Sequence, residues 1–495
     1  MLEDDNFLDA SVYISPPGDG IESDEDSDTE EGCSANHLSA SQLTAPAAFV
    51  INYGADTVNS LEHDNTDSDD EQPEAMDTGD KQNDISPTGN HMLAHCPPAV
   101  QYQWVNKDLK ETEFSNKPTA RHFTEPQTPT ALFSAFFNDD VIEYMVRMSN
   151  LYAQHDKSKH SFSTDVAEMR LFLAMLLLSG YSVLPRRKMY WENSDDVFNR
   201  AMSHAMSRNR FEEILSVFHL ADNHHLPPSD AFAKVRPLYA MINEKCLEYF
   251  LHDEHLSIDE SMLPYYGRHS SKQRIVGKPI RMGYKMWVLA SSDGYVVQFE
   301  PYQGAKKQGA IRSSATSWGL GESVVLDLLG ELSVQTSYHI FTDNFFTSFR
   351  LLSHLLEHNI QATGVIKSNK LGKCPVEAPK SLEKKERGYF DQKTDKRSSV
   401  TVVGWNDNRS VYVASNTAGA QPTATVSRWC RKTSSRIDVR QPRLIKLYNR
   451  HMGGVDRCDQ NISSYRISVR SKKWWWALFV WIPDMVLQNC WLLYR

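Results

Sequence analysis

Hydrophobic positions recur every three to four residues between residues 130 and 251, which is the spacing of one face of a helix. This spacing predicts helices over residues 130–137, 165–178, 209–220 and 238–250. Between them, Leu184-Pro-Arg-Arg-Lys-Met-Tyr-Trp191 sets three consecutive bases beside two aromatic residues. Such a run is typical of a DNA-backbone contact or a nuclear-import signal and, equally, of a basic loop that enters a helix.

From residue 254 the pattern changes to alternation of apolar and polar positions, with many β-branched and aromatic residues. It predicts strands at 256–262, 284–291, 295–301, 338–342 and 363–366, and helices at 323–332 and 346–358. A turn at Ser292-Asp-Gly294 joins the second strand to the third. Three strands, helix, strand, helix and strand is the order of a ribonuclease H-like α/β sheet.

Residues 367–435 interrupt this order with a segment rich in Lys, Arg and Ser. Its two β-rich runs flank Asn406-Asp-Asn-Arg409 and predict a β-rich insertion. The stretch 444–465 returns to helical spacing, and an apolar, tryptophan-rich helix follows over 474–494. Pro483 and Asp484 interrupt that last run, so we expect a core and dimer helix, kinked or ended at Pro483, and no membrane anchor.

Charge is unevenly distributed along the chain. Residues 1–100 hold 23 acids and one base, so the remainder holds 40 acids against 52 Lys and Arg, a net charge of +12. Acid-rich, aromatic-poor sequence predicts a disordered acidic tail over residues 1–117. A basic body favours a polyanionic partner such as nucleic acid, although a merely solvated basic surface has the same composition.

Cysteine and histidine spacing gives no metal or disulfide signature. The seven cysteines include no Cys-x-x-Cys pair, which argues for reduced, intracellular thiols and against a zinc ribbon. His219, His224 and His225 fit no ligand spacing and are expected to be surface or core residues. The acidic start of the chain has no apolar run and is unlike a signal peptide.

Four aspartates stand where a metal-dependent nuclease needs carboxylates. Asp259 lies in a predicted buried strand, where a carboxylate is costly unless it serves a site, and Asp343 ends the strand expected beside it. Asp456 and Asp459, three residues apart, share one helix face. Carboxylates clustered in this way hold two Mg²⁺ ions about 3.5–4 Å apart for phosphodiester cleavage.

Each aspartate also has a simpler interpretation. Asp343 fits the N-cap of the helix over 346–358, Asp456 and Asp459 fit a solvent-facing helix surface, and Asp259 fits the end of a strand. Three acids at the three places that a ribonuclease H-like site requires are, however, less expected by chance than any one of them.

Five stretches resemble the piggyBac transposase family in the same order along the chain, from about residue 118 to residue 495. They are Ser257-Ile-Asp259-Glu-Ser-Met-Leu-Pro, Gly277-Lys-Pro-Ile-Arg-Met-Gly-Tyr-Lys, Phe341-Thr-Asp343-Asn-Phe-Phe-Thr-Ser, Tyr448-Asn-Arg-His-Met-Gly-Gly-Val-Asp456-Arg-Cys-Asp459-Gln and Arg470-Ser-Lys-Lys-Trp-Trp. The resemblance implies a catalytic triad of Asp259, Asp343 and Asp456, a further acid at Asp459, and two Mg²⁺ ions held by these four residues.

The resemblance also implies a domain order. A ribonuclease H-like catalytic domain, 254–366 with its last helix at 436–460, would carry the β-rich insertion 367–435. The helical parts 118–253 and 461–495 would combine into one all-helical dimerisation and DNA-binding domain. The implied activity is DNA strand cleavage and transfer at transposon ends, directed to TTAA, by a homodimer on double-stranded DNA in the nucleus.

Basic residues around the motifs are the candidate DNA contacts: Lys272, Arg274, Arg281, Lys285, Arg466, Arg470, Lys472 and Lys473. One departure from the family is the C-terminal region, where such transposases usually carry a cysteine-rich zinc module and this sequence has Cys490 as its single late cysteine. The alternative function is therefore a domesticated, catalytically silent DNA-binding protein or dimer scaffold that acts in gene regulation.

Overall fold

The computed structural model describes residues 7–14, 47–53, 101–109, 127–251, 253–275, 278–304, 318–332, 337–431 and 433–495. The chain divides into two compact units, residues 1–88 and residues 89–495. In the first unit, strand β1 (Phe7–Ile14) pairs antiparallel with β2 (Ala47–Tyr53). Most of the predicted acidic tail, including its acidic runs around residues 22–31 and 62–74, lies outside the described residues.

Residues 101–109, which composition places in the tail, are ordered, and this corrects the prediction. The short strand β3 (Trp104–Val105) pairs with β10 (Phe390–Asp395). Trp104 packs its ring 5.2 Å from that of Phe349. Asp108 accepts hydrogen bonds of 3.0 Å from the backbone N–H groups of Ala420 and Gln421. One aromatic anchor and one well-placed carboxylate thus order a segment whose average composition is typical of disorder.

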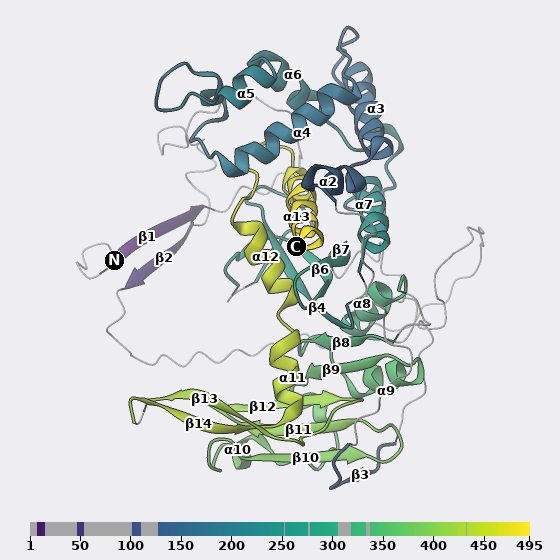
Figure 1. Cartoon of the computed structure of the whole chain (residues 1–495), viewed down its shortest axis with the longest axis vertical. Coiled ribbons are helices and arrows are strands. Elements are labelled where there is room, and N and C mark those ends of the chain that lie inside the picture. The colour runs from purple at the N-terminus through teal and green to yellow at the C-terminus, as the bar shows by residue number, and fades with distance from the viewer. Residues whose placement is uncertain are drawn as a thin grey trace. The chain divides into compact units, whose positions relative to one another are not determined.

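Helices dominate residues 127–251, as the three-to-four spacing predicts. They are α2 (Pro129–Phe136), α3 (Asp139–His155), α4 (Val166–Tyr181), α5 (Arg200–Ala205), α6 (Arg208–Val217) and α7 (Arg236–Glu248), with 3₁₀ turns η3 (Arg187–Trp191) and η4 (Asn223–His225). The side chains of Asn138, Asp165 and Ser207 cap α3, α4 and α6. Helices α3 and α5 were not among the predicted elements. Figure 1 shows this group of helices around the last helix of the chain.

The central sheet contains ten described strands, in the order β3-β10-β11-β12-β9-β8-β4-β6-β5, with β7 also paired to β6. The strands not yet given are β4 (His255–Pro264), β5 (Gln273–Arg274), β6 (Met282–Ser291), β7 (Val296–Pro301), β8 (His339–Thr342), β9 (Gln361–Val365), β11 (Thr401–Asn406) and β12 (Ser410–Ser415). The pairs β4–β8 and β8–β9 are parallel, and β4–β6 and β6–β7 are antiparallel. This is the predicted ribonuclease H-like arrangement.

Two helices follow strands of this sheet, and the insertion extends it. The helices are α8 (Leu320–Leu329) and α9 (Phe349–Glu357), with short turns η6 (Ser368–Leu371) and α10 (Pro379–Leu382) after β9. Strands β10 to β12 continue the same sheet beyond β9 rather than forming a separate one. Among the described strands, β13 (Ala424–Cys430) and β14 (Ser435–Gln441) pair only with each other, as a two-stranded ribbon beside helix α11 (Arg443–His451; Figure 1).

The single helix predicted over 444–465 is two helices, α11 (Arg443–His451) and α12 (Gly454–Ser463). The first residue of α12 packs closely on the sheet. A Cβ atom on Gly454 would lie 2.2 Å from the carbonyl oxygen of Ser291 and 2.6 Å from Oγ of Ser257. The start of α12 therefore presses its backbone directly onto β4 and β6, which only glycine permits.

The last helix, α13 (Trp476–Tyr494), runs through Pro483. Of the two predicted outcomes at this proline, a kink or an end, the structure excludes the end. Within this chain, Trp475 is fully buried beside Phe218, and Trp476 donates a 2.9 Å hydrogen bond from Nε1 to the carbonyl of Val469. Trp474 stacks on His269. No second protomer is needed to cover the three tryptophans. By length and composition α13 is apolar enough to cross a membrane, and 67% of that stretch is buried inside the protein.

Candidate functional site

Asp259 and Asp343 follow residues that are partners across two parallel strands. The register pairs Ile258 of β4 with Thr342 of β8, and each aspartate is the next residue of its strand. Adjacent strands lie about 4.8 Å apart, so Asp259, within β4, and Asp343, directly after β8, lie next to each other on two interior strands of the sheet. The strand register thus brings together two segments that are far apart in the sequence.

Helix α12 brings Asp459 to the same strand. Ser261 donates a 2.6 Å hydrogen bond from Oγ to Oδ1 of Asp459. Side chains alternate along a strand, so Ser257, Asp259 and Ser261 share the face of β4 on which α12 lies. The close packing of Gly454 against Ser257 holds the start of this helix down on that face.

Burial makes two of these carboxylates weak acids. Burial, helped by the negative charges of Glu260 and Asp343 and opposed by Lys278, raises the pKa of Asp259 to about 7. Burial likewise raises the pKa of Asp459 to about 6, against the opposing hydrogen bond from Ser261. Without a metal, Asp259 is therefore partly protonated near neutral pH, and a cation that binds it must displace that proton.

Two residues that the sequence analysis did not single out complete this cluster. Burial works to lower the pKa of Lys278, but Asp259, Glu260, Asp456 and Asp459 together raise it above its ordinary value. Burial raises the pKa of the Tyr448 hydroxyl, and the charges of Asp343, Asp259 and Asp456 raise it further. One lysine and one tyrosine thus interact electrostatically with carboxylates from β4, β8 and α12.

A signal for both residues existed in the sequence. Lys278 and Tyr448 lie inside two of the five motif stretches, and Ser261 lies two residues after Asp259, on the same face of the strand. Their roles depend on which segments contact each other in the fold, and the local pattern of apolar and polar residues does not predict those contacts.

The donor set suits a hard cation such as Mg²⁺, because carboxylate oxygens are its preferred protein ligands. The geometry is less complete: among the described residues, no three His, Cys, Asp or Glu side chains lie close enough together to hold one metal ion. Asp459 is occupied by Ser261, and Lys278 supplies the positive charge in the cluster. The residues that would hold a metal are Asp259, Asp343 and Asp456, with Asp459 beside them.

The simpler interpretation of Asp343 as a helix cap is wrong. The N-cap of α9 is Ser348, whose Oγ accepts a 3.1 Å hydrogen bond from the N–H of Leu351. Asp343 instead uses its backbone carbonyl, which accepts from Oγ1 of Thr347 at 2.9 Å. Its side chain is left available for the site.

The predicted DNA contacts separate into exposed and engaged residues. Arg274, Arg281, Arg470 and Lys472 are exposed. Lys285 is engaged: its Nζ lies 4.0 Å from the ring centroid of Trp287 and 3.8 Å from Oε2 of Glu260. Lys272 donates to the carbonyl of Gly267 at 2.7 Å, and Arg466 is half-buried beside Asp459 and Asp484.

Lys473 cannot contact DNA in this structure, which corrects its prediction. Only 2% of the residue is exposed. Its Nζ donates to the carbonyls of Leu215, Ser216 and Phe218 at 2.8, 3.1 and 3.0 Å. Lys473 therefore caps the carbonyl end of α6, where a cation also balances the negative end of the helix dipole.

The histidines behave as predicted for core and surface residues. His219 is buried and stacks on Tyr152 with ring centroids 3.6 Å apart, and burial lowers its pKa to about 2. His225 is exposed and bonded to Asp222 at 2.6 Å.

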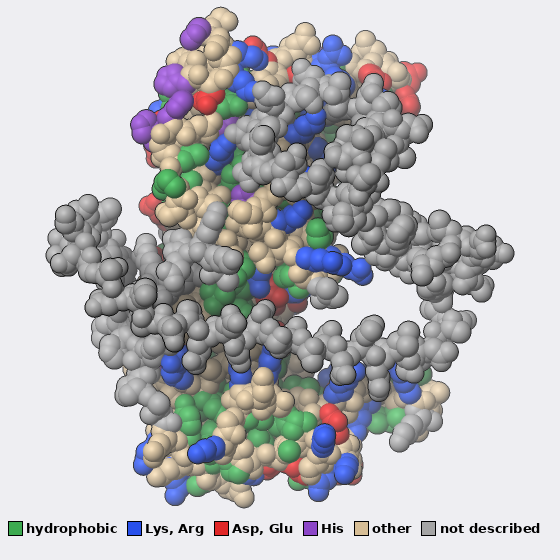
Figure 2. Space-filling view, turned by 180° about the vertical axis from the view of Figure 1, so that it is seen from behind, with side chains coloured by type: hydrophobic (Ala, Val, Ile, Leu, Met, Phe, Trp, Pro, Cys, Tyr) green, Lys and Arg blue, Asp and Glu red, His purple; other side chains and the backbone are tan. Residues whose placement is uncertain are grey.

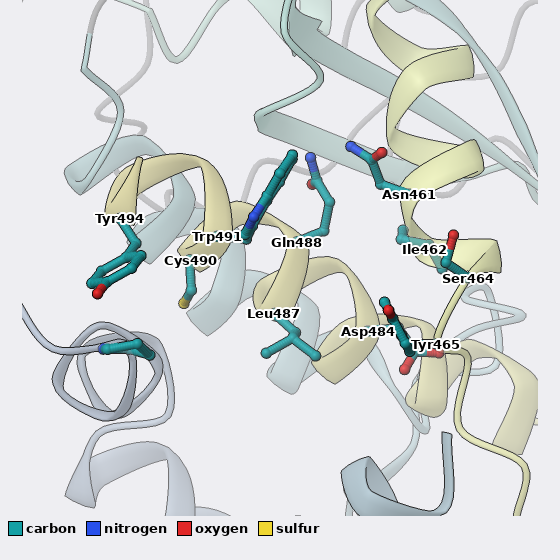
Figure 3. A pocket seen from close by; sticks show the side chains of 11 residues that line it. Asn461, Ile462, Ser464, Tyr465, Asp484, Leu487, Gln488, Cys490, Trp491 and Tyr494 are labelled. Carbon is teal, nitrogen blue, oxygen red and sulfur yellow. The ribbon is translucent and has the colours of Figure 1, made fainter. Parts of the chain in front are cut away.

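A cavity of about 380 Å³ lies between α2, α12 and α13, and none of the four aspartates lines it. Figure 3 shows Leu487, Trp491 and Tyr494 of α13 projecting around it. The polar group at its other side, Asp484, already accepts 3.2 and 3.4 Å hydrogen bonds from the N–H of Ile467. The carboxylate cluster and this cavity are thus separate features.

The chain is similar to a transposase family model, to piggyBac-derived human proteins and to a solved piggyBac transposase. A family model described as transposase IS4 matches residues 128–491. The human (Homo sapiens) piggyBac transposable element-derived protein 3 is 39% identical over 510 residues, covering 100% of this chain and 83% of that protein. The human piggyBac transposable element-derived protein 2 is 34% identical, covering 98% and 78%. The cryo-EM structure of a piggyBac transposase synaptic complex with hairpin DNA matches with a TM-score of 0.59 and 25% identity over 74% of each chain.

Proposed function

The chain belongs to the family of piggyBac transposase-derived proteins, and from this premise we propose that it acts on DNA in the nucleus, with an aspartate site for Mg²⁺-dependent strand cleavage and transfer. The double-stranded substrate would resemble transposon ends, with integration directed to TTAA. The observation that carries the proposal is the parallel register of β4 and β8, which sets Asp259 beside Asp343.

The residues of the cluster suit the steps of phosphodiester cleavage. Transposases with a ribonuclease H-like fold generally use Mg²⁺, which stabilises charge on the reacting phosphate and activates the attacking oxygen. Asp259, Asp343 and Asp456 would hold the metal. Lys278, set among these carboxylates, neutralises them in the free protein and offers a cation to the phosphate once the carboxylates are otherwise engaged.

The direct test is cleavage of duplex DNA that carries a transposon-like end, with the full chain, in Mg²⁺ and in EDTA. Strand-specific nicks that appear only with Mg²⁺ support the proposal. Duplex binding without nicking, at any Mg²⁺ concentration, supports the alternative of a catalytically silent DNA-binding protein or scaffold. One observation favours that alternative: among the described residues, no three potential ligands close around one metal position.

We expect duplex binding to depend steeply on salt, because the exposed cations Arg470, Lys472, Arg274 and Arg281 would neutralise phosphates. Figure 2 shows more Lys and Arg than Asp and Glu side chains among the described residues of one face. Each phosphate contact contributes a slope of about −0.9 to log K against log salt, so replacing both Arg470 and Lys472 with Gln should flatten the slope by about 2. Fluorescence anisotropy at several salt concentrations measures this, and an unchanged slope would remove these two residues from the interface.

We further propose a homodimer, supported by apolar side chains on the outer side of α13. Leu487, Trp491 and Tyr494 are 41%, 48% and 58% exposed around the cavity of Figure 3. Aromatic anchors of this kind dominate interface energies, and truncating one often costs more than about 2 kcal/mol. Trp491→Ala should therefore raise the dimer dissociation constant by roughly 30-fold. Sedimentation equilibrium checks this, and a wild-type chain that sediments as a monomer would contradict the proposal.

A further inference from the structure

The two faces of the β13–β14 ribbon differ in chemistry. On the inner face, Val426, Ile437 and Val439 pack against the small apolar cluster formed with β11 and α11. On the outer face, the register sets Thr425 opposite Arg440, Ser427 opposite Asp438 and Trp429 opposite Arg436. All six of these outer residues are exposed.

The ribbon is firmly held from its inner side. Arg387 donates a 3.0 Å hydrogen bond from Nη1 to the carbonyl of Trp429. Trp405 donates one of 2.8 Å from Nε1 to the carbonyl of Arg440. Arg428 forms an ion pair of 3.1 Å with Asp407, to which Arg387 is also bonded at 2.6 Å. The outer face is therefore presented on a fixed backbone.

Trp429 is the unusual residue of the outer face. It is 59% exposed, and its direct cross-strand neighbour is Arg436. A single exposed apolar residue needs no explanation by itself. Here, however, the ring stands beside cations: the exposed residues around it include Arg431, Arg436 and Arg440 against one acid, Asp438. Arg431 and Arg436 form no ion pair with any described residue. The face carries more cations than acids, and its one large aromatic ring lies near the hairpin turn.

A flat aromatic ring beside unpaired guanidinium groups is suited to binding two parts of a nucleic acid, the bases and the phosphates. Aromatic side chains stack on bases whose faces are free, and arginine binds the phosphates on either side. In a closed duplex the bases offer only their edges in the grooves, so a ring lying on a strand face has no base face to cover. The match is therefore to unpaired bases.

We propose that the β13–β14 ribbon is a second DNA surface, at which Trp429 stacks on an unpaired base while Arg431 and Arg436 bind the flanking phosphates. This inference rests on the DNA binding proposed above, and it adds a preference for locally opened strands. Duplex DNA remains the ligand of the exposed cations on the rest of the chain.

The test compares binding of the full chain to a labelled single strand of about 16 nucleotides and to the duplex of the same sequence. Trp429→Ala should weaken single-strand binding by about 5- to 100-fold and leave duplex binding within about 2-fold. Trp429→Phe keeps an aromatic face and should stay within about 3-fold of wild type on the single strand. The double variant Arg431→Gln with Arg436→Gln should reduce the salt slope for the single strand alone.

Asp438→Asn is the matched control on the same face. It removes the one acid of the ribbon and should tighten single-strand binding. Equal losses on single strand and duplex would overturn stacking on unpaired bases. Wild-type affinity of Trp429→Ala for the single strand would overturn the ribbon surface while leaving the proposed duplex binding intact. A wild-type chain that binds neither DNA at low salt would overturn both proposals.

Discussion

We expect Asp343→Asn to reduce Mg²⁺-dependent DNA cleavage by at least about 100-fold, because losing a metal ligand removes several kcal/mol of transition-state stabilisation. Folding should be retained, since the substitution removes one of several neighbouring negative charges. Duplex binding should also be retained, because the substitution leaves the exposed Lys and Arg residues that would contact the phosphates unchanged. Rates of nicking by wild type and variant, beside binding by anisotropy, measure the two properties separately.

Two further variants sharpen this test. Asp259→Asn should behave like Asp343→Asn, since the two residues are neighbours across β4 and β8. Asp293→Asn is the matched control: Asp293 is an exposed aspartate that forms an ion pair with Arg457, 3.2 Å away. It should cleave at the wild-type rate. Cleavage that survives in Asp343→Asn at more than a tenth of the wild-type rate would rule out this aspartate as a catalytic ligand.

The same site predicts a pH dependence with a definite sign. The pKa of Asp259 is raised to about 7, mainly by burial, so its carboxyl is mostly protonated at pH 6 and mostly ionised at pH 8. Only the ionised form binds a cation well. The Mg²⁺ concentration needed for half-maximal cleavage should therefore decrease as the pH is raised from 6 to 8. A requirement that is flat over this window would contradict the assignment of Asp259 as a ligand.

The second large effect concerns stability rather than chemistry. Lys473→Ala should destabilise the protein by about 3 kcal/mol or more, because three carbonyls at the end of α6 lose their donor and each buried unsatisfied group costs about 1–3 kcal/mol. The midpoint temperature of thermal unfolding should decrease by roughly 5 °C or more. DNA binding should weaken only as far as the folded fraction falls.

Lys472→Ala is the neighbouring control, because Lys472 is exposed. Its stability should stay within about 0.5 kcal/mol of wild type, as for most surface substitutions, while its duplex binding weakens. The contrast would reverse if Lys473 were a DNA contact: Lys473→Ala would then unfold like wild type and bind duplex less tightly.

The sequence by itself determined the central sheet and the places of Asp259 and Asp343 in it. The alternation in β4, β6 and β7 and the helices that precede β8 and β9 are local patterns, and the rules of strand connection leave few ways to assemble them. The parallel pairing of β4 with β8 then places Asp259 beside Asp343 without further information. The helices α2, α4, α6 and α7 are likewise predicted by local sequence patterns.

Tertiary structure decided what depends on partners distant in the chain. Whether Lys473 faces DNA or the end of α6 depends on contacts 255 to 258 residues away. The close packing of α12 on the sheet depends on Ser291 lying against Gly454, and the order of residues 101–109 depends on β10 and Phe349. Lys278 enters the carboxylate cluster only when β4 and α12 meet. Composition and periodicity predict the secondary structure that a segment prefers. Its burial and its hydrogen-bond partners depend on the part of the protein against which it packs.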